Sequence, residues 1–449
     1  MHLRALSLLV VCAFRAGAQA PSTTTHPVVL ISIDGLKPEY VLQADAYGLR
    51  IPNLRALVAR GAHATGVVGV VPTVTYPSHT TLVTGVAPAR HGIISNNTFD
   101  PLKRNQGGWY WYASDIRVPT LWDAVMDAGR TTGNVHWPVT VGARITWNLP
   151  QYWRTGEADD RKLVRALSTS GLYDAMEHEV GVPYADGIDE SLAGDELRAR
   201  FAVRMIESRH PALMLAYFTA LDHEQHGSGP FSHASLVTLE RIDGIVGTLV
   251  AAAARAYGSD VVIAIVSDHG FQRTTRAVNL IHALRSAGLV DYAPGAGDKP
   301  TAWRATIWSG GASAAIMLKD TADASTRTRV IKLLRSLAAD PSNGIERVID
   351  GAELRRRGGF PGAIALVNLR DGYTLGDNSR GPLVVNVSTG GMHGYLPDSP
   401  AMRASFIIAG PGIPAGRALG VIDQRAIAPT LARVLGVRLP DAEVAAVLP

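Results

Sequence analysis

Three long, almost continuously apolar stretches of the chain end in acidic residues. "VVLISIDG" ends at Asp34, "LMLAYFTALD" ends at Asp222, and "VVIAIVSDHG" ends at Asp268 and His269. Continuous apolar runs are typical of strands buried on both faces, so the pattern predicts a parallel sheet covered by helices. Open α/β sheets place their sites at the carboxyl ends of the strands, so we expect these four side chains along one edge.

Helical patterns lie between the apolar stretches. "IPNLRALVARG" and "PTLWDAVMDAGR" each begin beside a proline and end near a glycine, residues 236–257 are helical in pattern, and "AIAPTLARVLGV" predicts a closing helix. Strands that alternate with helices favour a doubly wound α/β fold.

Two segments interrupt this alternation. Residues of about 140–195 are rich in Trp, Tyr and Pro, and residues of about 285–385 mix short strands, one helix and many glycines. We expect one catalytic domain over residues 21–449, in which both segments are insertions that form a cap or lobe over the carboxyl edge of the sheet.

The first twenty residues follow a different pattern. Arg4 precedes an apolar run over residues 5–14, and "AQA" at residues 18–20 has the small residues of a cleavage site. The run is shorter than the ~20 apolar residues that span a bilayer. The pattern predicts a signal peptide over residues 1–20 and a secreted or periplasmic mature chain without a transmembrane anchor. Because the single cysteine, Cys12, lies in this segment, the mature chain would contain no disulfide.

Composition and charge exclude little else. The chain has 449 residues, of which 47% are hydrophobic, and it can therefore bury a large core. Its 43 basic and 39 acidic residues give a net charge of +4, which is too small to predict a stable complex with nucleic acid.

The stretch "VVPTVTYPSHTTLVTG" predicts a short helix that begins near Pro77 and ends at Gly85. Thr75, just before it, has two interpretations. It can be the N-cap of the helix, or it can be a nucleophile aimed at a phosphate, because a helix N-terminus favours an anion.

Histidines accompany the acidic strand ends. Asp222 and His226 are four residues apart, so on a helical turn both can bind one metal; His223 is a weaker competitor. "GGMHGYLP" places His393 in a glycine-lined surface loop. Oxygen and nitrogen ligands together suit Zn²⁺ better than an all-oxygen Mg²⁺ or Ca²⁺ site. The candidate ligands outnumber the needs of one tetrahedral zinc and fit two: Asp34, Asp222, His226, Asp268, His269 and His393.

These motifs, taken in order, resemble a known family. "ISIDG", "PTVTYPSHTTLVTG", "PARHGIISNN", "LDHEQHGSGP", "VSDHG" and "GMHGYLP" are similar to motifs of the nucleotide pyrophosphatase/phosphodiesterases of the alkaline phosphatase superfamily. The resemblance covers essentially the whole mature chain. It implies an alkaline phosphatase-like core sheet and hydrolysis of phosphodiester or pyrophosphate bonds in small molecules such as nucleotides.

The resemblance also implies roles for individual residues. It implies one zinc held by Asp34, Asp268, His269 and the oxygen of Thr75, and a second zinc held by Asp222, His226 and His393. Thr75 would be the nucleophile and would form a phosphothreonine. Asn96 would bind a non-bridging phosphate oxygen.

The sequence departs from the family pattern near Thr75. Many relatives have Phe after the threonine and then "PNH", whereas this chain has Tyr76 and Ser78. Tyr76 keeps an aromatic face that can stack on a base, so we expect it to bind substrate. For a second stacking aromatic, three tyrosines have equal standing: Tyr152, Tyr173 and Tyr184.

Other functions fit parts of the pattern. A sulfatase would need Cys or Ser followed by P-x-R, which this chain lacks. A phosphomonoesterase or a phosphonate hydrolase of the same superfamily shares the two-zinc core, and an inactive scaffold would act as a binding module. The sequence does not choose between nucleotide and phospholipid-type diesters, and it gives no oligomeric state.

Overall fold

The computed structural model describes residues 25–105, 108–152, 159–293 and 299–448. The expected signal peptide over residues 1–20 lies outside the described residues. Within those ranges, none of the helices has the length and apolar character needed to cross a membrane.

The central sheet is mostly parallel, as the apolar runs predict. Five adjacent strands run parallel, and the neighbouring strand on one side runs antiparallel to them. Across the sheet the strands are β18 (Arg417–Ala418), β2 (Ala62–His63), β17 (Phe406–Ala409), β7 (Val262–Val266), β1 (Val28–Ile33), β6 (Leu213–Phe218), β4 (Thr132–Val135) and β5 (Trp147–Leu149).

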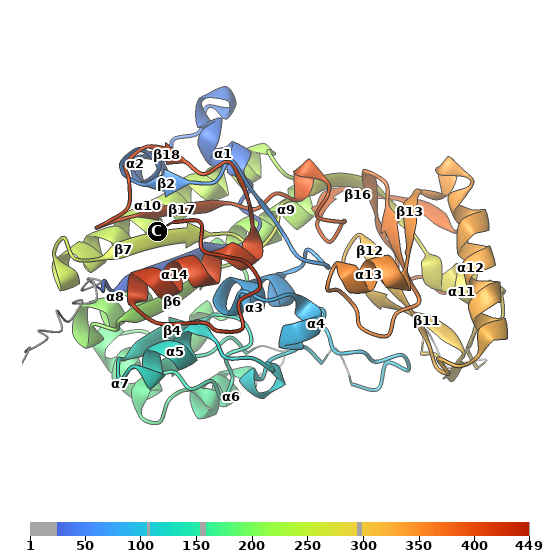
Figure 1. Ribbon diagram of the computed structural model, residues 1–449, viewed down its shortest axis with the longest axis horizontal. Helices are drawn as coiled ribbons and strands as arrows, with labels where there is room; N and C mark the ends of the chain where they lie inside the picture. Colours follow the sequence, from blue (N-terminus) through green and yellow to red (C-terminus); the bar gives the residue numbers. More distant parts are fainter. Residues whose placement is uncertain (1–24, 106–107, 153–158, 294–298, 449) are drawn as a thin grey trace, which may run out of the picture.

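Helices cover both faces of this sheet. Alternate residues of β1 belong to two separate cores, because successive side chains of a strand point to opposite faces. One core contains residues of α2 (Pro52–Arg60), α8 (Leu192–Arg209) and α10 (His233–Tyr257). The other contains residues of α3 (Thr75–Thr84), α5 (Leu121–Asp127) and α14 (Ile427–Leu435). This arrangement confirms the expected α/β class (Figure 1).

The predicted elements differ from the observed ones mainly at their ends. The helix expected over 236–257 begins three residues earlier, at His233, where the Ser232 side chain accepts the N–H of Ser235. The apolar run that leads to Asp222 is not one strand. β6 ends at Phe218, and α9 (Ala220–Ser228) carries Asp222.

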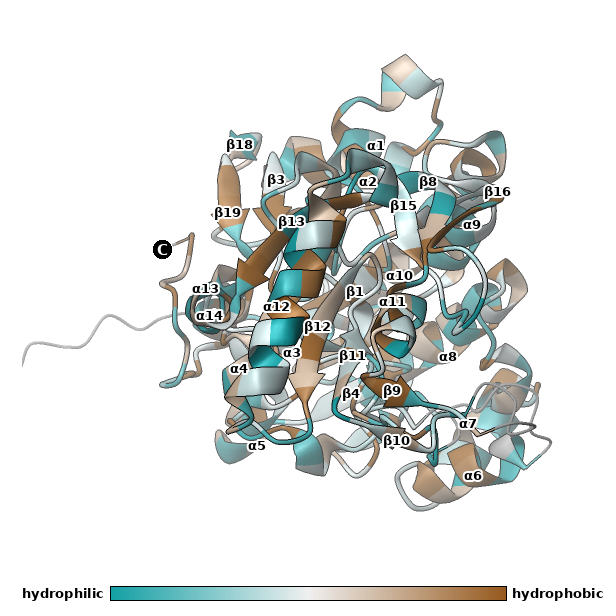
Figure 2. Cartoon of the chain, turned by 90° about the vertical axis from the view of Figure 1, so that its right-hand side faces the viewer, coloured by the Kyte–Doolittle hydropathy of each residue, from teal (hydrophilic) through white to brown (hydrophobic). Residues whose placement is uncertain are grey.

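A second region lies beside the central sheet and has its own core (Figure 1). Its four strands are antiparallel, in the order β11 (Ala305–Ser309), β12 (Ser313–Leu318), β14 (Ala365–Leu369) and β13 (Ile345–Asp350). It contains α11 (Leu280–Ser286), α12 (Ala324–Ala338) and α13 (Gly351–Arg356), rather than the single helix expected. Polar and apolar residues alternate around α12 in bands (Figure 2). Helix α12 buries Thr326, Val330 and Leu334. These residues are four positions apart and therefore lie on one face of the helix.

The other interrupting segment joins the central sheet. It supplies the edge strand β5, then α6 (Asp160–Leu167) and α7 (Leu172–Val180). How the chain divides into a core and insertions stays a prediction. A three-stranded sheet contains β15 (Gly372–Leu375), β8 (Gln272–Val278) and β16 (Val384–Met392). The remaining helices and strands are short: α1 (Pro38–Leu42), α4 (Pro88–His91), β3 (Gly66–Val68), β19 (Val421–Asp423), β9 (Val290–Asp291) and β10 (Ala302–Trp303).

Candidate metal centre and active site

Helix α3 begins at Thr75 itself. The N-cap position is held by Val74, and no side chain caps this helix. Gly85 ends it in the left-handed conformation, with φ of 74°, and its N–H bonds to the carbonyl of Thr81. Thr75 therefore does not act as the N-cap, and its role as a nucleophile stays a prediction.

Two carboxylates lie side by side at the carboxyl ends of β1 and β7. Asp34 and Asp268 are 2% and 0% exposed. One oxygen of each has a donor: the Tyr217 hydroxyl donates to Asp34 Oδ2, and the Gly35 N–H donates to Asp268 Oδ1 at 3.1 Å. The second oxygens, Asp34 Oδ1 and Asp268 Oδ2, are buried without a hydrogen-bond partner among the described residues.

Burial is the main cause that raises the pKa values of these two carboxyls. Burial, followed by the charges of Asp268 and Asp222, raises the pKa of Asp34 well above its usual value. Burial also raises the pKa of Asp268 to about 7. Positive charge placed next to these carboxyls would lower both pKa values and favour the ionised forms.

Helix α9 supplies the predicted pair of ligands one turn apart. His226 Nε2 lies 3.3 Å from Asp222 Oδ2. The His223 side chain is 63% exposed and pairs instead with Glu190, at 3.4 Å. The structure therefore brings His226, and not His223, into the cluster.

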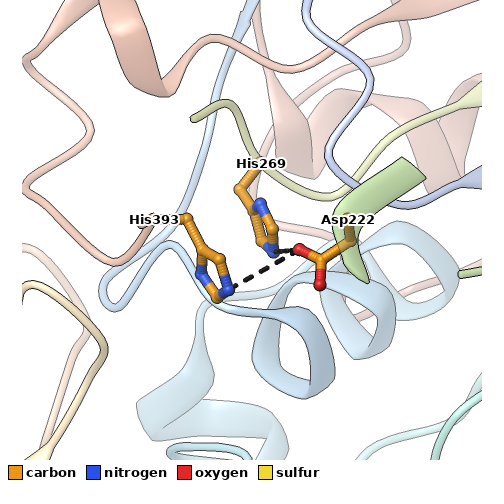
Figure 3. Close-up of side chains that lie close together, drawn as sticks. All are labelled: Asp222, His269 and His393. Atoms are coloured by element: carbon orange, nitrogen blue, oxygen red, sulfur yellow. Dashed lines mark ion pairs between the residues drawn. The ribbon is translucent and has the colours of Figure 1, made fainter. Parts of the chain in front are cut away.

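Two neighbouring strands bring His269 and His393 together from distant parts of the chain. β16 pairs with β8 so that Met392 lies opposite Gln272, and His393 and the segment before β8 therefore meet. The two imidazole rings stack with centroids 3.7 Å apart and an angle of 11°. Their Nε2 atoms lie 4.0 and 3.7 Å from the same oxygen, Asp222 Oδ1 (Figure 3). The expected surface loop for His393 is wrong, because the residue is only 6% exposed.

The three histidines share one hydrogen-bond arrangement. Nδ1 of His226, His269 and His393 lies 3.1 to 3.2 Å from a main-chain carbonyl oxygen, of Gly391, Gly270 and Thr73 respectively. A carbonyl only accepts, so each Nδ1 carries the proton and each Nε2 is left to bind a proton or a metal. This is the orientation that metal-ligating histidines usually have.

The residues fit a bound cation. Ligand atoms of Asp34, Asp268 and His269 lie within 4.8 Å of one another, and so do those of Asp222, His269 and His393. Four atoms that face this cluster are buried without a hydrogen-bond partner among the described residues: Asp34 Oδ1, Asp222 Oδ1, Asp268 Oδ2 and His269 Nε2. Carboxylate oxygen and imidazole nitrogen suit zinc and similar divalent metals. His269 lies in both groups. The geometry therefore does not separate the candidate ligands into the two distinct sets that the family resemblance implies.

Asn96 lies beside the start of α3. Its Oδ1 accepts the Tyr76 N–H at 2.9 Å, which leaves the Nδ2 amide as its donor. The Tyr76 ring is 1% exposed and lies against Trp109 and Trp111, and its hydroxyl donates to Gln151. Its expected stacking on a base stays a prediction.

The three candidate tyrosines occupy different places. Tyr152 contacts Trp111, which in turn contacts Tyr76. Tyr173 and Tyr184 contact one another edge-to-face, and Tyr184 also packs against Phe201 of α8. Of the three, Tyr152 is therefore the one connected to Tyr76 through ring contacts.

The sequence interpretation missed several residues around this site, among them Tyr217 and Glu190. Tyr217, which holds Asp34, looked like one more residue of a buried strand. Glu190 lies at the edge of the cluster, close enough that the charges of Asp222, His223 and His226 influence its carboxyl group, whose pKa is raised by burial first and Asp222 second. No local pattern distinguishes Glu190 from other acidic residues before a helix.

Comparison with known proteins shows the family to which the chain belongs. The sequence profile described as type I phosphodiesterase / nucleotide pyrophosphatase matches residues 28–396. An uncharacterized pyrophosphatase/phosphodiesterase of Schizosaccharomyces pombe is 27% identical over 255 residues, which cover 55% of this chain and 45% of the relative. Ectonucleotide pyrophosphatase/phosphodiesterase family member 3 of Rattus norvegicus is 25% identical over 276 residues, 59% of this chain and 27% of the relative.

A venom phosphodiesterase of Macrovipera lebetinus is 24% identical over 275 residues, 58% of this chain and 28% of the relative. The matched part of this chain thus spans less than half the length of each of these curated relatives.

Solved structures share the fold. Human ectonucleotide pyrophosphatase / phosphodiesterase 5 superposes with a TM-score of 0.63 at 21% identity, covering 92% of this chain and 95% of the human one. An inactive threonine-to-alanine variant of the murine protein, in complex with AMP, gives a TM-score of 0.64 at 19% identity, covering 92% and 96%. The likeness confirms the alkaline phosphatase-like α/β fold. The chain belongs to the type I phosphodiesterase / nucleotide pyrophosphatase family of the alkaline phosphatase superfamily.

Proposed function

We propose that this protein is a secreted two-zinc phosphodiesterase / nucleotide pyrophosphatase that acts through a phosphothreonine on Thr75. The observation that carries the proposal is the convergence, close to the first turn of α3, of buried carboxylate and imidazole atoms that make no hydrogen bond among the described residues. We assign Asp34, Asp268, His269 and Thr75 to one metal and Asp222, His226 and His393 to the other. Bound zinc ions would lower the pKa of a coordinated hydroxyl and offset charge on the phosphoryl oxygens.

The chain's own groups divide the reaction between them. Thr75 Oγ1 attacks phosphorus in line with the leaving oxygen, and its P–O bond forms as the ester bond breaks. The Thr75 proton is lost to solvent, and the leaving group departs into solvent, from which its oxygen takes up a proton. The Asn96 amide donates to a non-bridging oxygen, and the positive end of α3 favours the anionic group. Water then attacks the phosphothreonine, which releases a phosphomonoester and restores the Thr75 hydroxyl.

Backbone contacts hold the nucleophile next to the carboxylates. The Thr75 carbonyl accepts from His79 Nδ1 at 2.8 Å, and the same nitrogen lies 3.6 Å from Asp268 Oδ2. The carbonyl of Thr73 accepts from His393 Nδ1. Because α3 starts between these two contacts, its first residue is fixed relative to ligands of both proposed metals.

The charges around the site favour a diester over a monoester. A monoester dianion carries an extra charged oxygen, and the Glu190 carboxylate adds negative charge at the edge of the site. Lys37, close to Asp34 in sequence, is not available, because its Nζ donates to the carbonyls of Phe271 and Ala401. A diester has an esterified group in place of the extra charge, and binding that group can lower the barrier as well as the KM. The AMP complex of the murine neighbour supports a nucleotide as that group.

Two assays test this function. With zinc bound, kcat/KM for p-nitrophenyl thymidine 5′-monophosphate should exceed that for p-nitrophenyl phosphate at least ~100-fold, about 2.7 kcal/mol of transition-state stabilisation. Thr75→Ala should lose most of kcat yet still bind the diester, whereas Thr75→Ser should keep partial activity. A preference for the monoester would support a phosphomonoesterase instead. Normal turnover by Thr75→Ala, or full activity without metal, would contradict the proposal.

Export is a separate part of the proposal. The N-terminal pattern supports cleavage after residue 20, and one relative is named a venom phosphodiesterase. Mass spectrometry of the mature protein should show Pro21 as the first residue. A mature protein that still contains Arg4 would contradict this part alone.

A further inference from the structure

The helix that carries Asp222 and His226 is capped by a side chain from another helix. Thr219, at the N-cap of α9, makes no side-chain capping bond. Instead, Asp195 of α8 accepts the N–H of Thr219 on Oδ1 and the N–H of Ala220 on Oδ2, both at 2.9 Å. The carboxylate thus satisfies two N–H groups that a helix start leaves without partners, and it complements the helix dipole.

Arg198 connects this cap to a third segment. One terminal nitrogen donates to Asp195 Oδ1 and, at 2.9 Å, to the Thr219 hydroxyl. The other donates to the carbonyls of Gly187 and, at 2.6 Å, Asp189. Both the Asp195 and the Arg198 side chains are fully buried, at 0% exposure. A single planar guanidinium therefore joins α8, the start of α9 and the loop over residues 187–189.

This arrangement fixes the orientation of α9 and of the loop over residues 187–189 more than it stabilises the fold. A buried ion pair gives little net stability over apolar side chains of similar volume, whereas a planar guanidinium whose two terminal nitrogens both donate hydrogen bonds fixes the orientation of the groups it binds. The groups fixed here lead directly into the site. Asp222 lies on the first turn of α9, and Glu190, next to Asp189, pairs with His223 of the same helix.

We propose that Asp195 and Arg198 are positioning residues that set the orientation of α9, and hence how tightly Asp222, His226 and His393 bind a metal. This inference rests on the proposed two-metal function. The carboxylate of Asp195 and the guanidinium of Arg198 bond to neither Asp34 nor Asp268, which follow strands β1 and β7. Because Gln225 of α9 donates to the Gly35 carbonyl at 3.0 Å, the metal of this pair should be affected, but less than the other metal.

Zinc titration of the chelator-stripped full chain, followed by calorimetry, tests the inference. The wild type should show two binding events. Arg198→Lys keeps the positive charge but loses the planar guanidinium with its two terminal nitrogens. Asp195→Asn loses the negative charge and one of the two acceptor oxygens. Each variant should lower the zinc affinity of one binding event at least ~10-fold, because loss of groups that orient metal ligands commonly has an effect of this size. The zinc affinity of the other event should stay within about 2-fold of the wild type. At limiting zinc kcat should fall, with the KM for the diester within about 2-fold of wild type.

Arg204→Lys is the matched control. Arg204 also lies on α8 and pairs with Glu179, but its side chain is 43% exposed and its pair does not reach α9. Its isotherm should equal that of the wild type. If Arg198→Lys and Asp195→Asn do not fold, Thr219→Val removes only the hydroxyl that Arg198 contacts and should weaken the same event by a smaller factor.

The outcomes separate this inference from the function on which it rests. Folded variants with two unchanged binding events would overturn the positioning role and leave the two-metal function intact. A wild type that binds no zinc would overturn the function itself. Equal weakening of both events would also overturn the inference, because the effect would then not be specific to α9.

Discussion

The two halves of the proposed metal centre differ in how their charge is balanced. In the first half, two buried carboxylates, Asp34 and Asp268, face one imidazole, and the pKa of both carboxyls is raised by burial. In the second half, the Asp222 carboxylate faces the imidazoles of His226 and His393 and also lies near His269 of the first half. Although burial acts in the opposite direction, His226, His393 and His269 hold the pKa of Asp222 below its usual value.

The difference follows from where each half lies in the fold. Asp34 and Asp268 end central strands that are covered on both faces, whereas His226 lies on a short helix with its side chain 35% exposed. The first half therefore carries more negative charge in a more buried place, and it needs a cation more than the second half does. We expect the first half to bind its metal more tightly.

The largest effect should come from removing one carboxylate of the first half. Asp268→Asn keeps an oxygen that can accept the Gly35 N–H but loses the charge. We expect kcat/KM to fall at least ~1000-fold, about 4 kcal/mol, because the metal next to Thr75 is lost. The metal-free variant should melt no lower than the metal-free wild type, since the repulsion with Asp34 disappears.

Asp260→Asn is the control for this variant. Asp260 lies just before the amino end of the same strand, β7, and its side chain is 61% exposed. Its kinetics should match the wild type. Near-normal activity of Asp268→Asn would show that the first half is not the catalytic one.

A smaller effect should come from the second half. His393→Ala removes one of its imidazoles but leaves Asp34, Asp268 and His269 in place. After dialysis the variant should retain about one zinc rather than two, and its activity should recover in part when zinc is added in excess. Metal analysis and zinc-dependent kinetics measure both effects.

His282→Ala provides the comparison, because His282 lies on α11 in the second region and its Nδ1 faces the carbonyl of Ser379. Retention of two zinc ions by His393→Ala would contradict the assignment of His393 to the second half.

The smallest effect should come from the edge of the site. Glu190→Gln removes a negative charge beside Asp222 without changing a proposed ligand. The kcat/KM for p-nitrophenyl phosphate should rise by about 3-fold relative to the diester, a modest gain because the Glu190 side chain is 43% exposed and its charge is screened by solvent. Glu196→Gln, at 40% exposure and paired with Arg241, should leave the ratio unchanged. If kcat/KM for p-nitrophenyl phosphate fell relative to that for the diester, Glu190 would instead favour hydrolysis of the monoester.

Much of the site was predictable because its residues follow strong local signals. A buried strand is visible as an apolar run, and in a parallel sheet the residue after such a run lies at the functional edge. Asp34 and Asp268 were therefore placed by the sequence alone. Asp222 and His226 were predictable as a pair, because a spacing of four residues places two side chains on one face of a helix.

The tertiary structure decided what depends on contacts between distant segments. The pairing of β8 with β16 brings His393 onto His269, and no local pattern contains that register. The choice of His226 over His223, the exclusion of Thr75 as an N-cap and the burial of Tyr76 depend on where α9 and α3 start and on what packs against them. Asp195 and Arg198 read locally as an ordinary i, i+3 pair on a helix. Only the folded chain places that pair beneath α9, because burial and hydrogen-bond partners are properties of the packed chain rather than of any one segment.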